Sequence, residues 1–204
     1  KIDTSAESSS DFAWEYSVIA MHYNPDNREN TLYAGIANFL EELRVSAPTV
    51  IAHDPEACFL IMEDLGDEDL YSYRGENWMT RRGLYVRTLM HAHRLHRYFQ
   101  DDKGVALPEL MAGYDAGLYA WERQYFRKEF VEAVCKLTLS PSEEEALEEE
   151  GTDLGLRLRE SGTGLVHRDL QSQNVMIHEG APVLIDFQGM RTGSPFYDLG
   201  SLLY

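Results

Sequence analysis

The segment from His167 to Phe187 constrains the fold more than any other part of the chain. It reads His-Arg-Asp-Leu-Gln-Ser-Gln-Asn over 167–174 and Ile-Asp-Phe over 185–187. This spacing matches the catalytic loop H-R-D-L-x-x-x-N and the downstream Asp-Phe of phosphoryl-transfer enzymes. Two short apolar runs between these parts are separated by Glu-Gly-Ala-Pro, which predicts a β-hairpin. The hairpin would bring the two ends of the motif together.

Three polar residues of this segment are predicted to act as one unit. Asp169 would accept or orient the proton of an attacking hydroxyl group. Asn174 and Asp186 would bind Mg²⁺, because this cation prefers hard oxygen ligands and bridges nucleotide phosphates. The alternative is an ordinary loop followed by two buried strands, which gives no reason for the Asn and the Asp-Phe to stand in register.

The residues after Phe187 distinguish two kinds of kinase. A protein kinase has an activation segment that ends in Ala-Pro-Glu, whereas here residues 188–196 lead directly to Tyr-Asp-Leu-Gly-Ser-Leu-Leu over 197–203. With His-Arg-Asp, the following Asn and Ile-Asp-Phe-Gln, this ending resembles the aminoglycoside phosphotransferase and choline kinase superfamily. Within it, the chain is most similar to the bacterial branch that includes cell-wall amino-sugar kinases. A protein kinase remains an alternative, since H-R-D-L is its sequence as well.

The resemblance implies a two-lobed, protein-kinase-like α+β fold. A small, mainly antiparallel β N-lobe with one helix is expected to precede a larger, mainly helical C-lobe. The expected boundaries are 1–62 for the nucleotide-binding lobe, 63–70 for the hinge and 71–204 for the catalytic and acceptor-binding lobe. Relatives usually continue with further helices, so we expect the last lobe to be truncated here.

The resemblance also implies roles for the residues of the motif. Asp169 would be the catalytic base, ATP the phosphoryl donor, and Asn174 and Asp186 the Mg²⁺ ligands. Asp198 would bond back to the catalytic loop, although an acidic residue in the first turn of a helix is also favoured by the helix dipole. His167 and Arg168 would support the loop from behind the base.

The N-terminal part of the chain is predicted to form strands around one helix. The expected strands are 17–23, 48–52 and 58–62. In the family, the segment after the last of them is the hinge, which assigns nucleotide contacts to Met62, Glu63 and Leu65. The helix is predicted by apolar residues that recur on one face, namely Leu32, Ile36, Phe39 and Leu43.

The expected phosphate-binding parts of this lobe are weak or missing. Ser8, Ser9 and Ser10 stand where a turn of small residues would cover the phosphates with backbone N–H groups, but a serine run near a chain start is equally typical of a flexible tail. The strand that should carry a phosphate-binding lysine has Met21 or His22 in its place. The lysines of the chain are Lys1, Lys103, Lys128 and Lys136.

The missing lysine leaves several alternatives open. Arg28 or another group substitutes for it, Mg²⁺ carries more of the charge stabilisation, or activity is impaired. The last case would make the chain a catalytically weak nucleotide-binding regulatory module. Glu29 is therefore assigned no lysine partner.

Three further helices are predicted in the C-lobe. The helix over 79–99 carries His91, His93 and His96, but a histidine-rich surface is favoured over a zinc site, which needs three or four convergent ligands. Ser140 to Glu143 is a capping box that begins another helix. A helix over 113–131 has an aromatic stripe, predicted to be core or alternatively the wall of an acceptor pocket: Leu118, Trp121, Tyr125, Phe126 and Phe130.

Net charge and hydropathy restrict the partners. The formal net charge of −17 repels nucleic acid and anionic membranes and favours a cationic acceptor such as an aminoglycoside, an amino alcohol or an amino sugar. No apolar run approaches the roughly 20 residues of a membrane span, and Cys58 and Cys135 show no pairing pattern, which predicts a reduced, cytoplasmic protein. The predicted function is phosphoryl transfer from ATP to a hydroxyl of a small molecule, with a sugar or amino sugar favoured.

Overall fold

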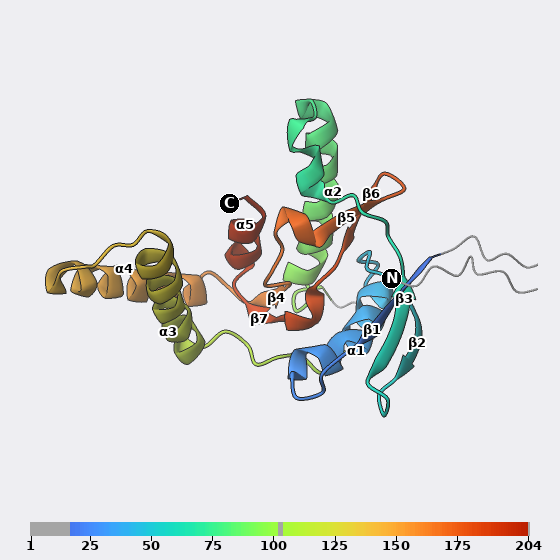
Figure 1. Ribbon diagram of the computed structural model, residues 1–204, viewed down its shortest axis with the longest axis horizontal. Coiled ribbons are helices and arrows are strands. Elements are labelled where there is room, and N and C mark those ends of the chain that lie inside the picture. The colour runs from blue at the N-terminus through green and yellow to red at the C-terminus, as the bar shows by residue number, and fades with distance from the viewer. Residues whose placement is uncertain (1–16, 102–103, 204) are drawn as a thin grey trace, which may run out of the picture.

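The computed structural model describes residues 17–101 and 104–203, which form a sheet-containing lobe and a larger helical lobe (Figure 1). This is the predicted α+β architecture. The first lobe contains the antiparallel sheet β1–β3–β2, formed by β1 (Val18–His22), β2 (Val50–Asp54) and β3 (Phe59–Glu63). The predicted strands are present, with ends that differ by one or two residues, as is usual for strand termini.

Helix α1 (Arg28–Glu42) connects the sheet to the rest of the molecule. It begins at Asn27, whose side chain accepts a hydrogen bond from the backbone N–H of Glu29. Its predicted apolar face is buried, and it packs on β2 and on the short helix η4 (Phe187–Gly189) that follows the hairpin. Because η4 belongs to the motif segment, α1 lies directly against the candidate site.

The second lobe is built around two short pairs of strands. The pair β5 (Val175–His178) and β6 (Ala181–Leu184) is the predicted hairpin. Its turn residues Glu179 and Gly180 both have positive φ, as a two-residue hairpin turn of type I′ requires. The pair β4 (Gly164–Val166) and β7 (Arg191–Gly193) encloses the motif segment in sequence. The β4–β7 pair therefore holds the two ends of that segment side by side, and the hairpin lies within it.

Helices cover these strands. Helix α2 (Trp78–His96) packs on β4 and β6, and α5 (Pro195–Leu203) packs on β4. The short helix η1 (Leu70–Gly75) precedes α2, and η3 (Ser172–Asn174) precedes β5. No described helix is long and apolar enough to cross a membrane. One continuous apolar core runs from α1 into the second lobe, and its fully buried members include Ile36, Leu40, Leu95, Leu165, Leu184 and Phe187.

The helix pair α3 (Ala116–Tyr125) and α4 (Pro141–Glu160) projects away from the strands (Figure 1). Helix α3 continues as the π-helical segment η2 (Phe126–Val134). The predicted capping box of α4 is present, because the backbone N–H and the hydroxyl of Ser140 both donate to Glu143 Oε2 at 2.7 Å.

The predicted burial of the aromatic stripe on α3 and η2 is wrong. Trp121, Tyr125, Phe126 and Phe130 are each between 46% and 56% exposed. The reason is that α3 packs on α4 in a projecting pair, so that much of its surface has no described element against it. The rings shield one another instead, in the stacked pairs Trp121–Tyr125 and Phe126–Phe130.

Candidate active site

The predicted catalytic loop, residues 167–174, is held by one buried carboxylate at the start of α5. The backbone N–H groups of His167 and Arg168 donate to Asp198 Oδ2 and Oδ1, both at 2.9 Å, and Asp198 is fully buried. His96 Nε2 lies 2.9 Å from the same Oδ2. Ser201 Oγ adds a hydrogen bond to the carbonyl oxygen of Arg168 at 3.2 Å. Asp198 therefore joins α5, α2 and the catalytic loop.

The loop residues before the predicted base have unusual backbone and burial. Arg168 has φ of 82°, a left-handed conformation that is uncommon for a residue with a Cβ atom and that the contacts with Asp198 and Ser201 maintain. The imidazole of His167 is completely buried, and this burial lowers its pKa despite the nearby carboxylate of Asp198. The imidazole therefore lies in the core, and its role in supporting the loop stays a prediction.

The predicted base and metal ligands come together at one place. Asn174 Nδ2 donates to the backbone oxygen of Asp169 at 2.8 Å and lies 3.4 Å from Asp186 Oδ2. The backbone N–H of Ile185 donates to the carbonyl oxygen of Asn174 at 3.0 Å, which closes the hairpin beside the site. Gln188 Nε2 donates to the other oxygen of Asp186 at 2.6 Å.

The donor set at this place suits Mg²⁺. Asn174 uses its amide nitrogen in both bonds, so its Oδ1 is available to a cation, and each oxygen of the exposed Asp186 retains a lone pair. Mg²⁺ is typically bound through one or two carboxylates together with substrate phosphates. Within residues 17–101 and 104–203, no three His, Cys, Asp or Glu side chains form a cluster able to hold a metal. The residues thus fit a cation shared with a nucleotide better than a closed protein cage.

The histidines of α2 have other roles. His96 contacts Asp198, as described above, and the backbone N–H of Ser46 donates to His91 Nδ1 at 3.4 Å. His93 is exposed. Of these three histidines, His93 lies on the surface as predicted, whereas His91 and His96 are partly buried against other elements.

Glu29 joins α1 to two arginines of the second lobe. Its Oε1 lies 3.1 Å from Arg168 Nη1 and 3.3 Å from Arg191 Nη2. Arg168 Nη1 is also 3.7 Å from Asp169 Oδ2. Burial alone would lower the pKa of Arg168, but the carboxylates of Asp169 and Glu29 outweigh it and raise that pKa. No lysine partner was expected for Glu29, and its two arginine partners were not predicted.

Several predicted nucleotide contacts lie where β3 passes into the second lobe. Met62 is buried, and its Sδ accepts a hydrogen bond from Tyr33 at 3.1 Å. Glu63 Oε2 accepts from the backbone N–H of Thr49, and Leu65 O lies 3.3 Å from His178 Nδ1. Their nucleotide-binding role stays a prediction. Ser8, Ser9 and Ser10 lie outside the described residues.

The described structure gives no cation in place of the missing lysine at β1. Met21 is partly buried there and His22 is exposed. Arg28, the substitute considered from the sequence, pairs with Glu109 at 2.5 Å, and both side chains are more than 60% exposed. Arg28 is therefore occupied by a surface ion pair.

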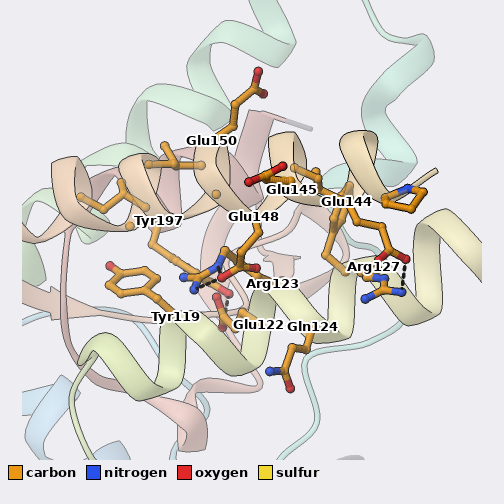
Figure 2. A pocket seen from close by; sticks show the side chains of 17 residues that line it. Tyr119, Glu122, Arg123, Gln124, Arg127, Glu144, Glu145, Glu148, Glu150 and Tyr197 are labelled. Carbon is orange, nitrogen blue, oxygen red and sulfur yellow. Dashed lines mark hydrogen bonds and ion pairs between the residues drawn. The ribbon is translucent and has the colours of Figure 1, made fainter. Parts of the chain in front are cut away.

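A separate groove of about 950 Å³ lies between α3 and α4 (Figure 2). Its lining includes Tyr197 but none of Asp169, Asn174 and Asp186. Ion pairs cross between the helices, from Arg123 to Glu148 at 2.7 Å and from Arg127 to Glu144 at 2.6 Å. These pairs neutralise part of the acidic surface that the run of glutamates on α4 suggests.

Two tyrosines converge on Glu122, which lines the groove. Tyr114 and Tyr197 both donate to Glu122 Oε1, at 3.0 and 2.8 Å, and their rings pack with centroids 4.7 Å apart. Burial raises the pKa of Tyr197 to about 12. The guanidinium of Arg191 lies 5.6 Å from the centre of the Tyr114 ring. A pattern search could not have found this cluster, because its members are scattered through the second half of the chain.

Comparisons with known proteins identify the family and the fold. The family model described as the phosphotransferase enzyme family matches residues 7–204. No curated protein sequence matches the chain. Among solved structures, a choline kinase from Streptococcus pneumoniae, LicA, is 15% identical with a TM-score of 0.57, and the alignment covers 94% of this chain and 62% of that protein. Such identities establish the fold alone.

Two aminoglycoside phosphotransferases give similar results. APH(2")-IIa in its gentamicin complex is 19% identical with a TM-score of 0.62, over 93% of this chain and 64% of that one. APH(3'')-Id from Streptomyces rimosus, in complex with ADP and streptomycin, is 16% identical with a TM-score of 0.55, over 91% and 70%. The chain thus spans less than two thirds of the length of the choline kinase and of APH(2")-IIa.

Proposed function

We propose that this chain, which belongs to the phosphotransferase enzyme family, transfers the γ-phosphoryl group of ATP to a hydroxyl group of a small molecule. One observation carries the proposal, namely the convergence of Asp169, Asn174 and Asp186. The amide of Asn174 contacts both the backbone of Asp169 and the carboxylate of Asp186. A base and two hard oxygen ligands at one place are among the protein groups that phosphoryl transfer uses.

In this mechanism the protein mainly positions groups and stabilises charge. Asn174 and Asp186 would hold Mg²⁺, which supplies charge neutralisation at the nucleotide phosphates. Asp169 accepts the proton of the acceptor hydroxyl and orients its oxygen for in-line attack on the γ-phosphorus, so that the O–P bond forms as the bond to ADP breaks. Asp198 holds the loop that carries Asp169 through two backbone N–H groups.

A sugar or amino sugar is the favoured acceptor. The support is the Ile-Asp-Phe-Gln sequence after the hairpin and the net charge of −17, which suits a cationic molecule. An aminoglycoside or an amino alcohol is the alternative. APH(2")-IIa is known in complex with gentamicin, and the Streptococcus pneumoniae relative is a choline kinase.

A second candidate function follows from strand β1. Residues 18–22 read Val-Ile-Ala-Met-His, so the described strand offers no lysine to the phosphates. This observation favours a regulatory module that binds the nucleotide and turns it over slowly or not at all. The intact Asp169, Asn174 and Asp186 favour the enzyme.

The test is nucleotide consumption by the chain with Mg²⁺ and ATP against a panel of amino sugars, aminoglycosides and amino alcohols. We expect acceptor-dependent ADP formation that Asp169→Asn lowers by about 10²–10⁴-fold. Asp115→Asn is the matched control, because Asp115 caps α3 by accepting from the backbone N–H of Leu118. Binding of MgATP without turnover would support the regulatory module, whereas loss of both binding and turnover would refute both functions.

A further inference from the structure

The ion pairs of Glu29 connect the two lobes at the catalytic loop. Glu29 lies in the first turn of α1, where an acidic residue is favoured by the helix dipole alone. That effect does not explain its side-chain contacts, which reach across 139 residues to Arg168 and across 162 residues to Arg191. One carboxylate oxygen thus accepts from two guanidinium groups of the second lobe.

The surroundings of this cluster are closely packed. Arg191 is only 5% exposed, and its Nε donates to the carbonyl oxygen of Gly189 at 3.0 Å. A Cβ atom added at Gly189 would lie 3.2 Å from Arg168 Nη1 and 3.7 Å from Glu29 Oε1. Glycine at this position therefore leaves the space in which the two side chains meet. The cluster is therefore partly buried, because Arg191 is buried while the side chains of Arg168 and Glu29 are 25% and 26% exposed.

The charges in the cluster bear directly on Asp169. Arg168 Nη1 lies between Glu29 Oε1, at 3.1 Å, and Asp169 Oδ2, at 3.7 Å, and it is closer to Glu29. Two arginines thus share Glu29, and one of them also neighbours the predicted base. Without the charge of Glu29, the guanidinium of Arg168 would have Asp169 as its remaining carboxylate neighbour in the described contacts and would move toward it. The orientation of Asp169 then depends on a residue of the other lobe.

Protein kinases provide a contrast. There, a helix glutamate pairs with the lysine of the third strand, and this pair must be in place for activity. Here β1 has no lysine, and the glutamate of α1 pairs with arginines on either side of the metal-ligand segment. The helix is consequently tied to the catalytic loop and to β7, and not to the strand that precedes it.

We propose that Glu29 is a positioning residue of the phosphoryl-transfer site, which holds Arg168 and Arg191 and thereby fixes the orientation of Asp169 relative to α1. The proposal rests on the proposed function. It assigns to Glu29 no contact with the nucleotide or the acceptor. Its effect is therefore on the rate of the bound complex and not on substrate affinity.

The experiment compares Glu29→Gln with Glu109→Gln in the full chain. Glutamine keeps the shape of Glu29 and removes its charge. We expect kcat to fall roughly 10- to 100-fold, the size of effect that a small misplacement of a catalytic group produces, while KM for MgATP changes less than about twofold. Glu109 is the matched control because it forms the exposed pair with Arg28 on the same turn of α1. We expect Glu109→Gln to leave both constants unchanged.

A double variant tests whether Glu29 acts through the arginines. If it does, Glu29→Gln added to Arg191→Met lowers kcat by much less than the product of the two single effects, because both remove the same contact. Multiplicative effects, a rise in KM with kcat retained, or an unchanged kcat would each overturn the proposal.

A third measurement is independent of turnover. Hydrogen exchange of the His167 and Arg168 amides, which Asp198 protects, is expected to be at least tenfold faster in Glu29→Gln than in the wild type and unchanged in Glu109→Gln. If the wild type turns over no acceptor, the proposed function fails. The exchange rates of these two amides then test the positioning role of Glu29 independently of turnover. Unchanged exchange, or faster exchange throughout the chain, would then overturn the positioning role.

Discussion

Replacement of Asp198 gives the sharpest test of how the catalytic loop is held. Asp198→Ala removes the acceptor of two backbone N–H groups, those of the buried His167 and the partly buried Arg168, and leaves both without this partner. A hydrogen bond to a charged group contributes about 1.5–3 kcal/mol. The loss of two such bonds is therefore expected to lower the free energy of unfolding by roughly 3–6 kcal/mol, which overlaps the roughly 3–5 kcal/mol lost when one partner of a buried ion pair is removed.

The assay is urea unfolding followed by circular dichroism. The expected loss corresponds to a decrease in Tm of roughly 6–24 °C for a chain of this size, which is a large part of the total stability of about 5–15 kcal/mol that is usual for a domain. Asp198→Asn is the milder variant, because its single side-chain oxygen still accepts from one of the two N–H groups. Asp115→Ala, an exposed cap of α3, is expected to cost only about 1 kcal/mol. If Asp198→Ala cost no more than Asp115→Ala, the bracing role of Asp198 would be refuted.

Two further predictions concern packing and capping. Gly164→Ala is expected to destabilise the chain by about 1–3 kcal/mol, because its Cβ would lie 2.5 Å from the backbone oxygen of His96. Gly35→Ala, in the open middle of α1, should instead stabilise the chain by about 1 kcal/mol in the same unfolding assay. Equal effects of the two substitutions would contradict this packing of β4 on α2. The backbone N–H and then the hydroxyl of Ser140 lower the pKa of Glu143 from its ordinary value of 4.5. The stabilisation from this capping box is therefore present above pH 4.5 and lost as the pH falls through the lower folded pKa. A carboxyl NMR titration should show that Ser140→Ala raises this pKa only partly, and an unchanged pKa would argue against the hydroxyl bond.

Local patterns in the sequence were sufficient to predict most elements of the fold. The α1 face, the hairpin β5–β6 and the capping box of α4 each depend on residues within one or two turns of one another, so spacing alone reveals them. The grouping of Asp169, Asn174 and Asp186 was predictable for the same reason, because one short hairpin connects its parts. The burial of the aromatic residues on α3 was not predictable, since periodicity shows that a helix has an apolar face and not whether another element covers it.

The two arginine partners of Glu29 could not be predicted from local sequence patterns. A sequence motif assigns a glutamate on this helix to a lysine on the preceding strand, and the absence of that lysine leaves the glutamate unexplained. The structure supplies Arg168 and Arg191, each more than 130 residues away, through the packing of α1 on η4. Arg168 is itself part of the His-Arg-Asp sequence. The three residues that predict a catalytic loop therefore also contain a cation that pairs with Glu29 of α1. The loss of a lysine from β1 therefore does not leave α1 detached from the site, and the charge balance around Asp169 is set by a glutamate and two arginines that only the folded chain brings together.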